Sequence, residues 1–86
     1  MTSRTMHINL FIYACGHHRA AWRHPDSAVE RLGDIRYYEE LAQIAERGKL
    51  DAVFFADGSS VDSVEDGPRW FLEPLTCLAA LSRATE

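Results

Sequence analysis

Two short apolar runs on either side of one amphipathic segment constrain the fold of this 86-residue chain more than any other feature. Residues 7–14 and 51–57 are rich in β-branched, aromatic and small apolar residues, a pattern typical of strands. Between them, apolar residues recur at three- and four-residue steps over residues 35–47, which predicts a helix. Asp34 suits the capping position before this helix and Gly48 the position that ends it. The order strand, helix, strand favours a right-handed βαβ unit with parallel strands.

The first strand has two different faces. Alternate residues form one aliphatic face (Ile8, Leu10, Ile12, Ala14) and one mixed polar and aromatic face (His7, Asn9, Phe11, Tyr13). We therefore expect both faces to be covered, one by helices and the other by groups that can hydrogen-bond. Strands buried on both sides are typical of parallel sheets in α/β proteins.

Two polar segments and one further helix complete the chain. Residues 15–33 lack periodicity and contain three histidines, which predicts a long loop with a short helical turn at 27–32. Residues 58–69 predict a second loop, and Pro74 suits the first turn of an apolar helix that ends near Thr85. Long loops in compact domains are usually functional, so the candidate site should involve residues 15–33.

The composition of the chain limits the binding partners and the cellular compartment that we expect for it. Nine Lys and Arg against thirteen Asp and Glu give a net charge of −4, which argues against nucleic acid. The longest apolar run is about seven residues, far short of the ~20 that cross a bilayer, and the first residues lack a secretion pattern. We therefore expect a cytoplasmic protein with no membrane partner. Cys15 and Cys77 lack CxxC spacing, so we expect reduced thiols, with neither a disulfide nor a zinc site.

The predicted β-α-β-α order describes an incomplete architecture. A sheet of two parallel strands leaves both outer edges unpaired and needs more neighbours than this sequence supplies. We expect residues 1–86 to form a single incomplete α/β domain. Such a domain is either part of a larger fold or associates with other copies of itself.

Few residues are candidates for chemistry. Asp57 ends the second strand, at the edge where α/β folds bind ligands, and it either faces a ligand or opens a turn with Gly58. Cys15 is either a nucleophile or a small buried apolar residue. The histidines of residues 15–33 lack HxxxH spacing, which favours hydrogen bonding to a polar ligand over metal binding. Residues 58–60 lack the glycine spacing of a phosphate loop, which disfavours a Rossmann nucleotide site.

Several segments together resemble one family. They are Cys15-Gly16-His17-His18, Ala21-Trp22-Arg23-His24-Pro25, residues 37–57 from Tyr-Tyr-Glu-Glu to Phe-Phe-Ala-Asp, and Leu72-Glu73-Pro74-Leu75-Thr76. In this order they resemble the amino-terminal part of the bacterial luciferase-like flavin monooxygenases, in the branch of nitrilotriacetate monooxygenase component A. The similarity runs from His7 along nearly the whole chain.

The resemblance implies a fold and an activity. The fold would be a TIM (β/α)8 barrel, of which this chain supplies the first two βα units. The activity would be oxygenation of a small organic substrate by O2 with reduced FMN, which a separate NAD(P)H-dependent flavin reductase supplies. By the same resemblance Asp57 would contact the flavin, and Tyr13, Cys15 and His17 would lie near the substrate pocket.

The resemblance also leaves gaps. A barrel's phosphate site usually comes from the loops after strands seven and eight, which this sequence does not contain, and no catalytic residue can be assigned. The intact protein is expected to be a homo-oligomer, and the 86-residue chain alone is expected to be inactive. The alternative is a non-catalytic remnant or a self-associating interaction module, which would bind no flavin.

Overall fold

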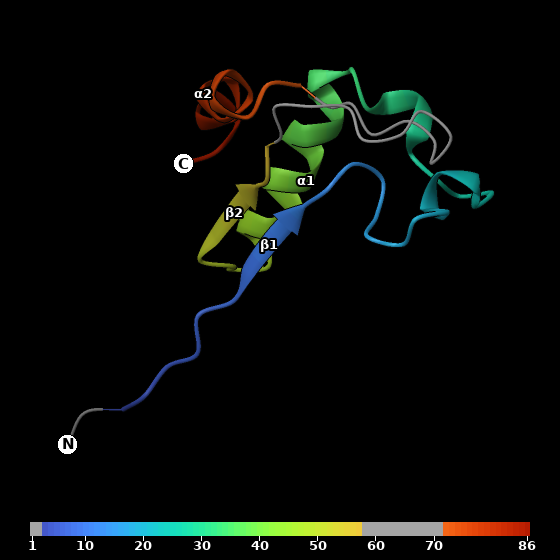
Figure 1. Ribbon diagram of the computed structural model, residues 1–86. Coiled ribbons are helices and arrows are strands. Elements are labelled where there is room, and N and C mark those ends of the chain that lie inside the picture. The colour runs from blue at the N-terminus through green and yellow to red at the C-terminus, as the bar shows by residue number, and fades with distance from the viewer. Residues whose placement is uncertain (1–2, 58–71) are drawn as a thin grey trace.

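The computed structural model describes residues 3–57 and 72–86. Its elements follow the order β1 (Asn9–Ile12), η1 (Ala21–Arg23), η2 (Val29–Arg31), α1 (Ile35–Arg47), β2 (Ala52–Phe55) and α2 (Pro74–Ala84), where η1 and η2 are single 3-10 turns (Figure 1). The predicted β-α-β-α order is confirmed, as is the helical turn expected within residues 27–32. The second predicted loop, over residues 58–69, lies outside the described residues.

The two strands pair in parallel, as predicted. Asn9 lies opposite Ala52 and Ile12 opposite Phe55, so the strands are in register over four residues each. Both strands are shorter than the apolar runs that predicted them. β1 ends before Ala14, whose φ of 45° is incompatible with a strand. Because the strands are parallel, the carboxyl ends of β1 and β2 lie at the same edge of the sheet (Figure 1).

The ends of α1 follow the predicted capping residues. The Asp34 carboxylate accepts a hydrogen bond from the Arg36 backbone N–H at 2.9 Å, which satisfies one of the unpaired donors of the first turn. At the other end Gly48 is the C-cap, but its φ of −76° is right-handed. The left-handed residue is Lys49, with a φ of 59°. Gly48 is therefore not used for the conformational freedom that usually places glycine after a helix.

The amino end of α2 is capped by Glu73. Its carboxylate accepts hydrogen bonds from the backbone N–H groups of Leu75 at 2.8 Å and Thr76 at 3.0 Å. These two bonds lower the pKa of Glu73 below its ordinary value. Pro74 occupies the first turn, as predicted, where its missing N–H costs no hydrogen bond.

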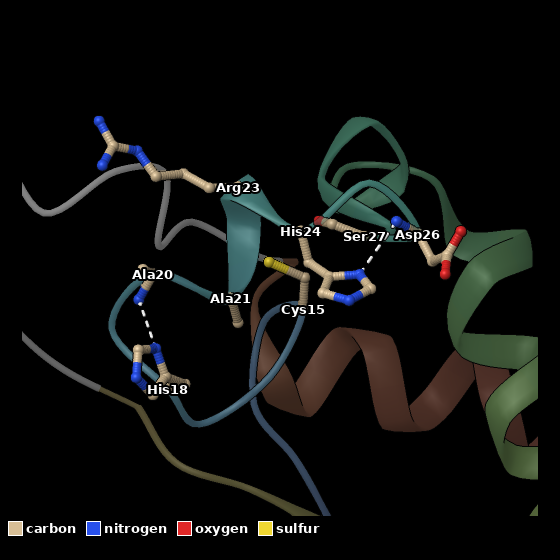
Figure 2. Close-up of a pocket in the computed structure, with 8 residues that line it drawn as sticks. All are labelled: Cys15, His18, Ala20, Ala21, Arg23, His24, Asp26 and Ser27. Carbon is tan, nitrogen blue, oxygen red and sulfur yellow. Dashed lines mark hydrogen bonds between the residues drawn. The ribbon is translucent and has the colours of Figure 1, made fainter.

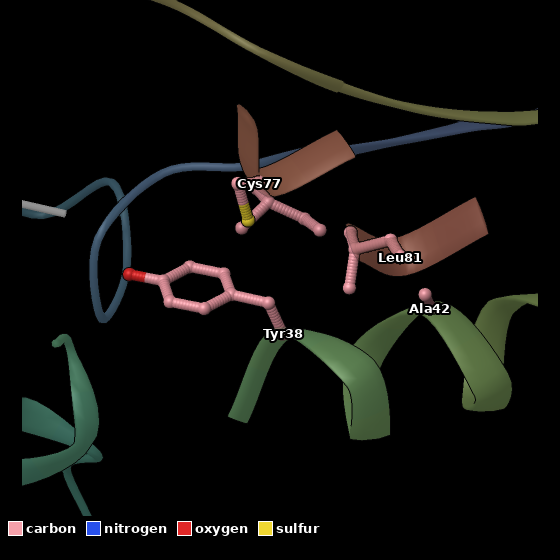
Figure 3. Close-up of a cluster of buried hydrophobic side chains, with 5 residues drawn as sticks. Tyr38, Ala42, Cys77 and Leu81 are labelled. Atoms are coloured by element: carbon pink, nitrogen blue, oxygen red, sulfur yellow. The ribbon is translucent and has the colours of Figure 1, made fainter. Parts of the chain in front are cut away.

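One apolar core lies between the sheet and the two helices. Its buried members are Ile12, Tyr38, Ala42, Cys77 and Leu81 (Figure 3). Tyr38 is fully buried, and its hydroxyl donates to the Leu32 carbonyl oxygen at 2.6 Å. From the sheet, Leu10, Val53 and Phe55 pack against this core. Leu10 and Ile12 of the predicted aliphatic face therefore meet the helices, whereas Ile8 precedes β1 and is 50% exposed, and Ala14 follows the strand.

The opposite face of the sheet carries no helix among the described residues. This agrees with the expectation that helices cover one face, and the groups expected to cover the other face stay a prediction. Phe11 and Phe54 lie on the other face and stack on each other, and Phe54 remains 45% exposed. The reason is topological, because α1 connects β1 to β2 on one side and α2 packs on that same side (Figure 1).

The buried tyrosine makes stability sensitive to alkaline pH. Burial raises the pKa of Tyr38 to about 12 from an ordinary 10.0, with a smaller contribution from Cys77, whose own pKa burial also raises. Because the folded-state pKa lies above the unfolded one, this stabilisation is complete below about pH 10 and is lost as the pH approaches 12. We expect the urea midpoint to fall over this range, and to fall less steeply in Tyr38→Phe. Identical slopes in the two proteins would contradict this assignment.

Among the described residues, no helix has the length and apolar character needed to cross a membrane.

Candidate functional site

The carboxyl edge of the sheet gathers most of the residues singled out in the sequence. Ile12 and Phe55 are the paired last residues of the two strands. The chain that leaves β1 carries Tyr13, Cys15 and His17, and the chain that leaves β2 reaches Asp57 two residues later. Parallel strands place ligands at this edge, so it is the candidate site.

A tight turn follows β1. The Gly16 backbone N–H donates to the Tyr13 carbonyl oxygen at 2.9 Å, and Ala14 within the turn has a left-handed φ of 45°. Gly16 has a φ of 139°, and a Cβ added there would meet the Cβ of Ala21 at 3.0 Å. Glycine is required here both by its backbone conformation and by the close approach of Ala21. After the turn, the His17 ring meets the rings of Phe11 and Tyr13.

This turn produces a cluster of four aromatic rings, which we call the π cluster: Phe11, Tyr13, His17 and Phe54. Phe11 stacks on Phe54 with ring centroids 4.6 Å apart and an interplanar angle of 10°. His17 stacks on Tyr13 at 5.2 Å and meets Phe11 edge-on at 4.8 Å. Phe11 and Phe54 of the cluster lie on the sheet face that the helices leave open, where Phe54 remains 45% exposed. It offers a ligand flat aromatic surface together with one imidazole and one phenol.

Cys15 lies elsewhere. It lines an open depression of about 590 Å³ together with residues from the loop that follows: His18, Ala20, Ala21, Arg23, His24, Asp26 and Ser27 (Figure 2). The structure thus brings Tyr13 and His17 together and places the half-buried Cys15 outside their ring contacts.

The other two histidines of the loop have local structural roles. The Nδ1 atom of His18 accepts from the Ala20 backbone N–H at 3.1 Å, and that of His24 accepts from Asp26 N–H at 3.1 Å (Figure 2). These bonds close two turns of the loop. The described residues contain no group of three or more His, Cys, Asp or Glu side chains arranged to hold a metal ion.

Asp57 is exposed and follows the end of β2 by two residues. Strand alternation would place it on the same face as Val53 and Phe55, which pack against the helix core. The strand ends at Phe55, however, so alternation does not fix the direction of Asp57. Its alternative role, opening a turn with Gly58, involves a residue outside those that the structure describes.

Sequence reasoning missed the support behind the turn. Arg31 donates two hydrogen bonds to the Glu40 carboxylate, at 2.8 and 2.9 Å, and its guanidinium lies 5.5 Å from the ring centroid of Tyr37. The Tyr37 hydroxyl lies 3.4 Å from the Ala14 carbonyl oxygen. Arg31 and Glu40 are nine residues apart, so no local spacing rule connects them.

Comparison with known proteins shows which class of enzyme the chain is similar to. No family model matches the chain. Over 99% of its length it is 45% identical to N-acetyl-S-(2-succino)cysteine monooxygenase of Bacillus subtilis (strain 168), and over 98% it is 36% identical to nitrilotriacetate monooxygenase component A of Aminobacter aminovorans. Over 64% of its length it is 46% identical to long-chain alkane monooxygenase of Geobacillus thermodenitrificans (strain NG80-2). All three relatives are oxygen-inserting enzymes by name.

The resemblance inferred from the sequence is thereby confirmed. The chain is similar to monooxygenases of the luciferase-like type, and it spans about a fifth of the length of the first two relatives, 20% and 21%.

Proposed function

We propose that the chain forms the first two βα units of a TIM barrel in a two-component, flavin-dependent monooxygenase. The observation that carries this proposal is the π cluster at the carboxyl edge of a parallel sheet whose other face is packed with helices. In a barrel the helices lie outside and ligands bind at the carboxyl ends of the strands. The open aromatic face is then the inner wall of the barrel.

The described residues are chemically suited to reduced FMN. An isoalloxazine ring is planar, and the stacked faces of Phe11 and Phe54 offer flat apolar surface with ring centroids 4.6 Å apart. At the same sheet edge, Asp57 offers carboxylate oxygens that can accept hydrogen bonds from a flavin ring N–H or a ribityl hydroxyl. When bound, the flavin supplies the activation of O2 that amino-acid side chains cannot provide. We assign its phosphate to parts of the protein beyond this segment.

The segment's own residues would shape the pocket. Tyr13 and His17 stack at 5.2 Å, and in the complete barrel the apolar rings beside them would help to keep water away from the reacting atoms. Their polar groups, a phenol and an imidazole, can orient a small organic substrate. Cys15 is a weaker candidate for the pocket, because it lines the separate depression.

The function can be tested in the full-length protein with reduced FMN from an NAD(P)H-dependent flavin reductase and ¹⁸O2. Two relatives are named for acting on nitrilotriacetate and on N-acetyl-S-(2-succino)cysteine, so these compounds are the first probes. We expect one ¹⁸O atom in the oxygenated product and no product without the reductase. Tight binding of reduced FMN without oxygenation of either probe would support the cofactor assignment and would contradict the choice of these two compounds as substrates. Failure to bind reduced FMN would refute the proposed function.

The second candidate is a self-associating, non-catalytic module. It is favoured by exposed apolar side chains, since Met6 is 81% exposed and Leu75 77% exposed. Such side chains are often covered by a partner. A cytoplasmic homo-oligomer is compatible with both candidates, and light scattering after size-exclusion chromatography measures the number of copies. Reduced-FMN binding separates the two, because the module would bind none.

A further inference from the structure

We infer that Tyr37 is a positioning residue, which holds the turn after β1 and thereby keeps Tyr13 and His17 stacked in the candidate pocket. This inference rests on the proposed function for its consequence in catalysis. The geometry itself, from α1 to the turn, stands independently of it.

The turn needs external support. Ala14 is held at a φ of 45°, a conformation that costs an L-residue free energy and persists only where its surroundings enforce it. One internal hydrogen bond, from Gly16 N–H to the Tyr13 carbonyl oxygen, closes the turn. The Ala14 carbonyl oxygen faces the Tyr37 hydroxyl at 3.4 Å, a long hydrogen bond that links this peptide group to α1.

Tyr37 is itself fixed from two sides. Its ring meets the fully buried Tyr38 ring edge-on, with centroids 5.1 Å apart. On another side lies the Arg31 guanidinium, which the Glu40 carboxylate holds through two short hydrogen bonds. Tyr37 and Glu40 both belong to α1. The same helix therefore carries the Tyr37 phenol and the Glu40 carboxylate that holds the Arg31 guanidinium beside it. A rigid element thus supports the turn.

The phenol stays protonated over the ordinary pH range. Burial is the main cause that raises the pKa of Tyr37, the nearby Cys15 adds to it, and Arg31 partly opposes it. A protonated hydroxyl can donate toward the Ala14 carbonyl oxygen. A phenolate would present like charge to that oxygen.

Losing the contact between the Tyr37 hydroxyl and the Ala14 carbonyl oxygen is expected to change the direction in which the chain leaves the sheet. Without it, Ala14 can relax toward a negative φ, and the next residues leave the sheet at a different angle. His17 then moves off Tyr13 and Phe11, its two ring partners in the π cluster. Displacing a pocket residue by about 1 Å can lower catalytic rates substantially.

The test compares Tyr37→Phe with Tyr38→Phe in the full-length protein. Both variants lose one hydroxyl from adjacent rings of α1, but the Tyr38 hydroxyl bonds to Leu32 and not to the turn. The first readout is the NMR signal of the His17 imidazole, assigned by its disappearance in His17→Gln. We expect Tyr37→Phe to shift this signal, because ring currents from Tyr13 and Phe11 change, and Tyr38→Phe to leave it unchanged.

The second readout is steady-state oxygenation. We expect Tyr37→Phe to raise KM for the substrate about three- to tenfold, the equivalent of one weak hydrogen bond, with a melting temperature close to that of the parent. Tyr38→Phe should lower the melting temperature and leave KM unchanged. An unchanged His17 signal in Tyr37→Phe overturns the inference, whether or not the protein oxygenates the probes.

A second pair of variants tests the inference even if Tyr37→Phe fails to fold. Arg31→Glu removes the two hydrogen bonds from Arg31 to Glu40. It should shift the His17 signal in the same direction as Tyr37→Phe does. Adding Glu40→Arg restores an opposite-charge pair and should return the signal toward its original position. If the reversed pair fails to restore it while the protein remains folded, Arg31 does not act through Tyr37.

Discussion

Replacing Tyr38 with alanine is expected to produce the largest loss of stability of any single change in the described core. The Tyr38 side chain is fully buried, its ring lies 6.1 Å from Phe55 and 5.1 Å from Tyr37, and its hydroxyl donates to Leu32. Truncating a large buried aromatic residue costs about 3 to 5 kcal/mol, because the cavity refills only in part. Urea unfolding of the full-length protein at neutral pH measures this directly.

Ile44→Ala is the matched control for that experiment. Ile44 lies on the same helix, but its side chain is 55% exposed and few contacts are lost with it. Alanine also has the higher helix propensity, so we expect a change within about 0.5 kcal/mol. A Tyr38→Ala loss no larger than the Ile44→Ala change would show that the core between α1, α2 and the sheet does not support the folded state.

The elements of this fold were predictable from the sequence because each is encoded locally. The helix over 35–47 has both an apolar repeat and a capping aspartate at Asp34, and α1 begins and ends at those residues. The parallel pairing follows from the strand, helix, strand order, since the crossover over α1 returns the chain in the same direction. The helical turn within 27–32 was also predicted. The turn η1 was not, because three residues are too few to show periodicity.

The site was less predictable because it depends on contacts between distant residues. The resemblance implies that Tyr13, Cys15 and His17 lie near the substrate pocket. The structure stacks Tyr13 with His17 and puts Cys15 on the wall of the depression. A positive φ at alanine has no sequence signature. The Arg31–Glu40 pair likewise forms only after the loop packs on α1. Strand alternation could not orient Asp57, because pairing stops two residues earlier.

Asp57→Ala is expected to weaken reduced-FMN binding about ten- to a hundredfold in the full-length protein, since a hydrogen bond to a charged group contributes roughly 1.5 to 3 kcal/mol. This expectation rests on the proposed function and on the position of Asp57 at the carboxyl edge of β2. Asp57→Asn keeps the size of the side chain and one oxygen acceptor, so we expect an intermediate loss. Fluorescence titration under anaerobic conditions gives the affinities.

The chain supplies a matched carboxylate at the opposite end of the same strand. Asp51 precedes β2, accepts a hydrogen bond from the Ile8 backbone N–H at 2.9 Å and lies 3.3 Å from the His7 imidazole. These contacts tie the amino ends of the strands together, far along the sheet from the candidate site. Asp51→Ala should therefore lower the melting temperature by a few degrees and leave reduced-FMN affinity intact, whereas Asp57→Ala should weaken reduced-FMN binding more than it weakens folding. If Asp57→Ala instead lowers the melting temperature and leaves the affinity unchanged, Asp57 serves the turn after β2 and the flavin contact must come from another residue.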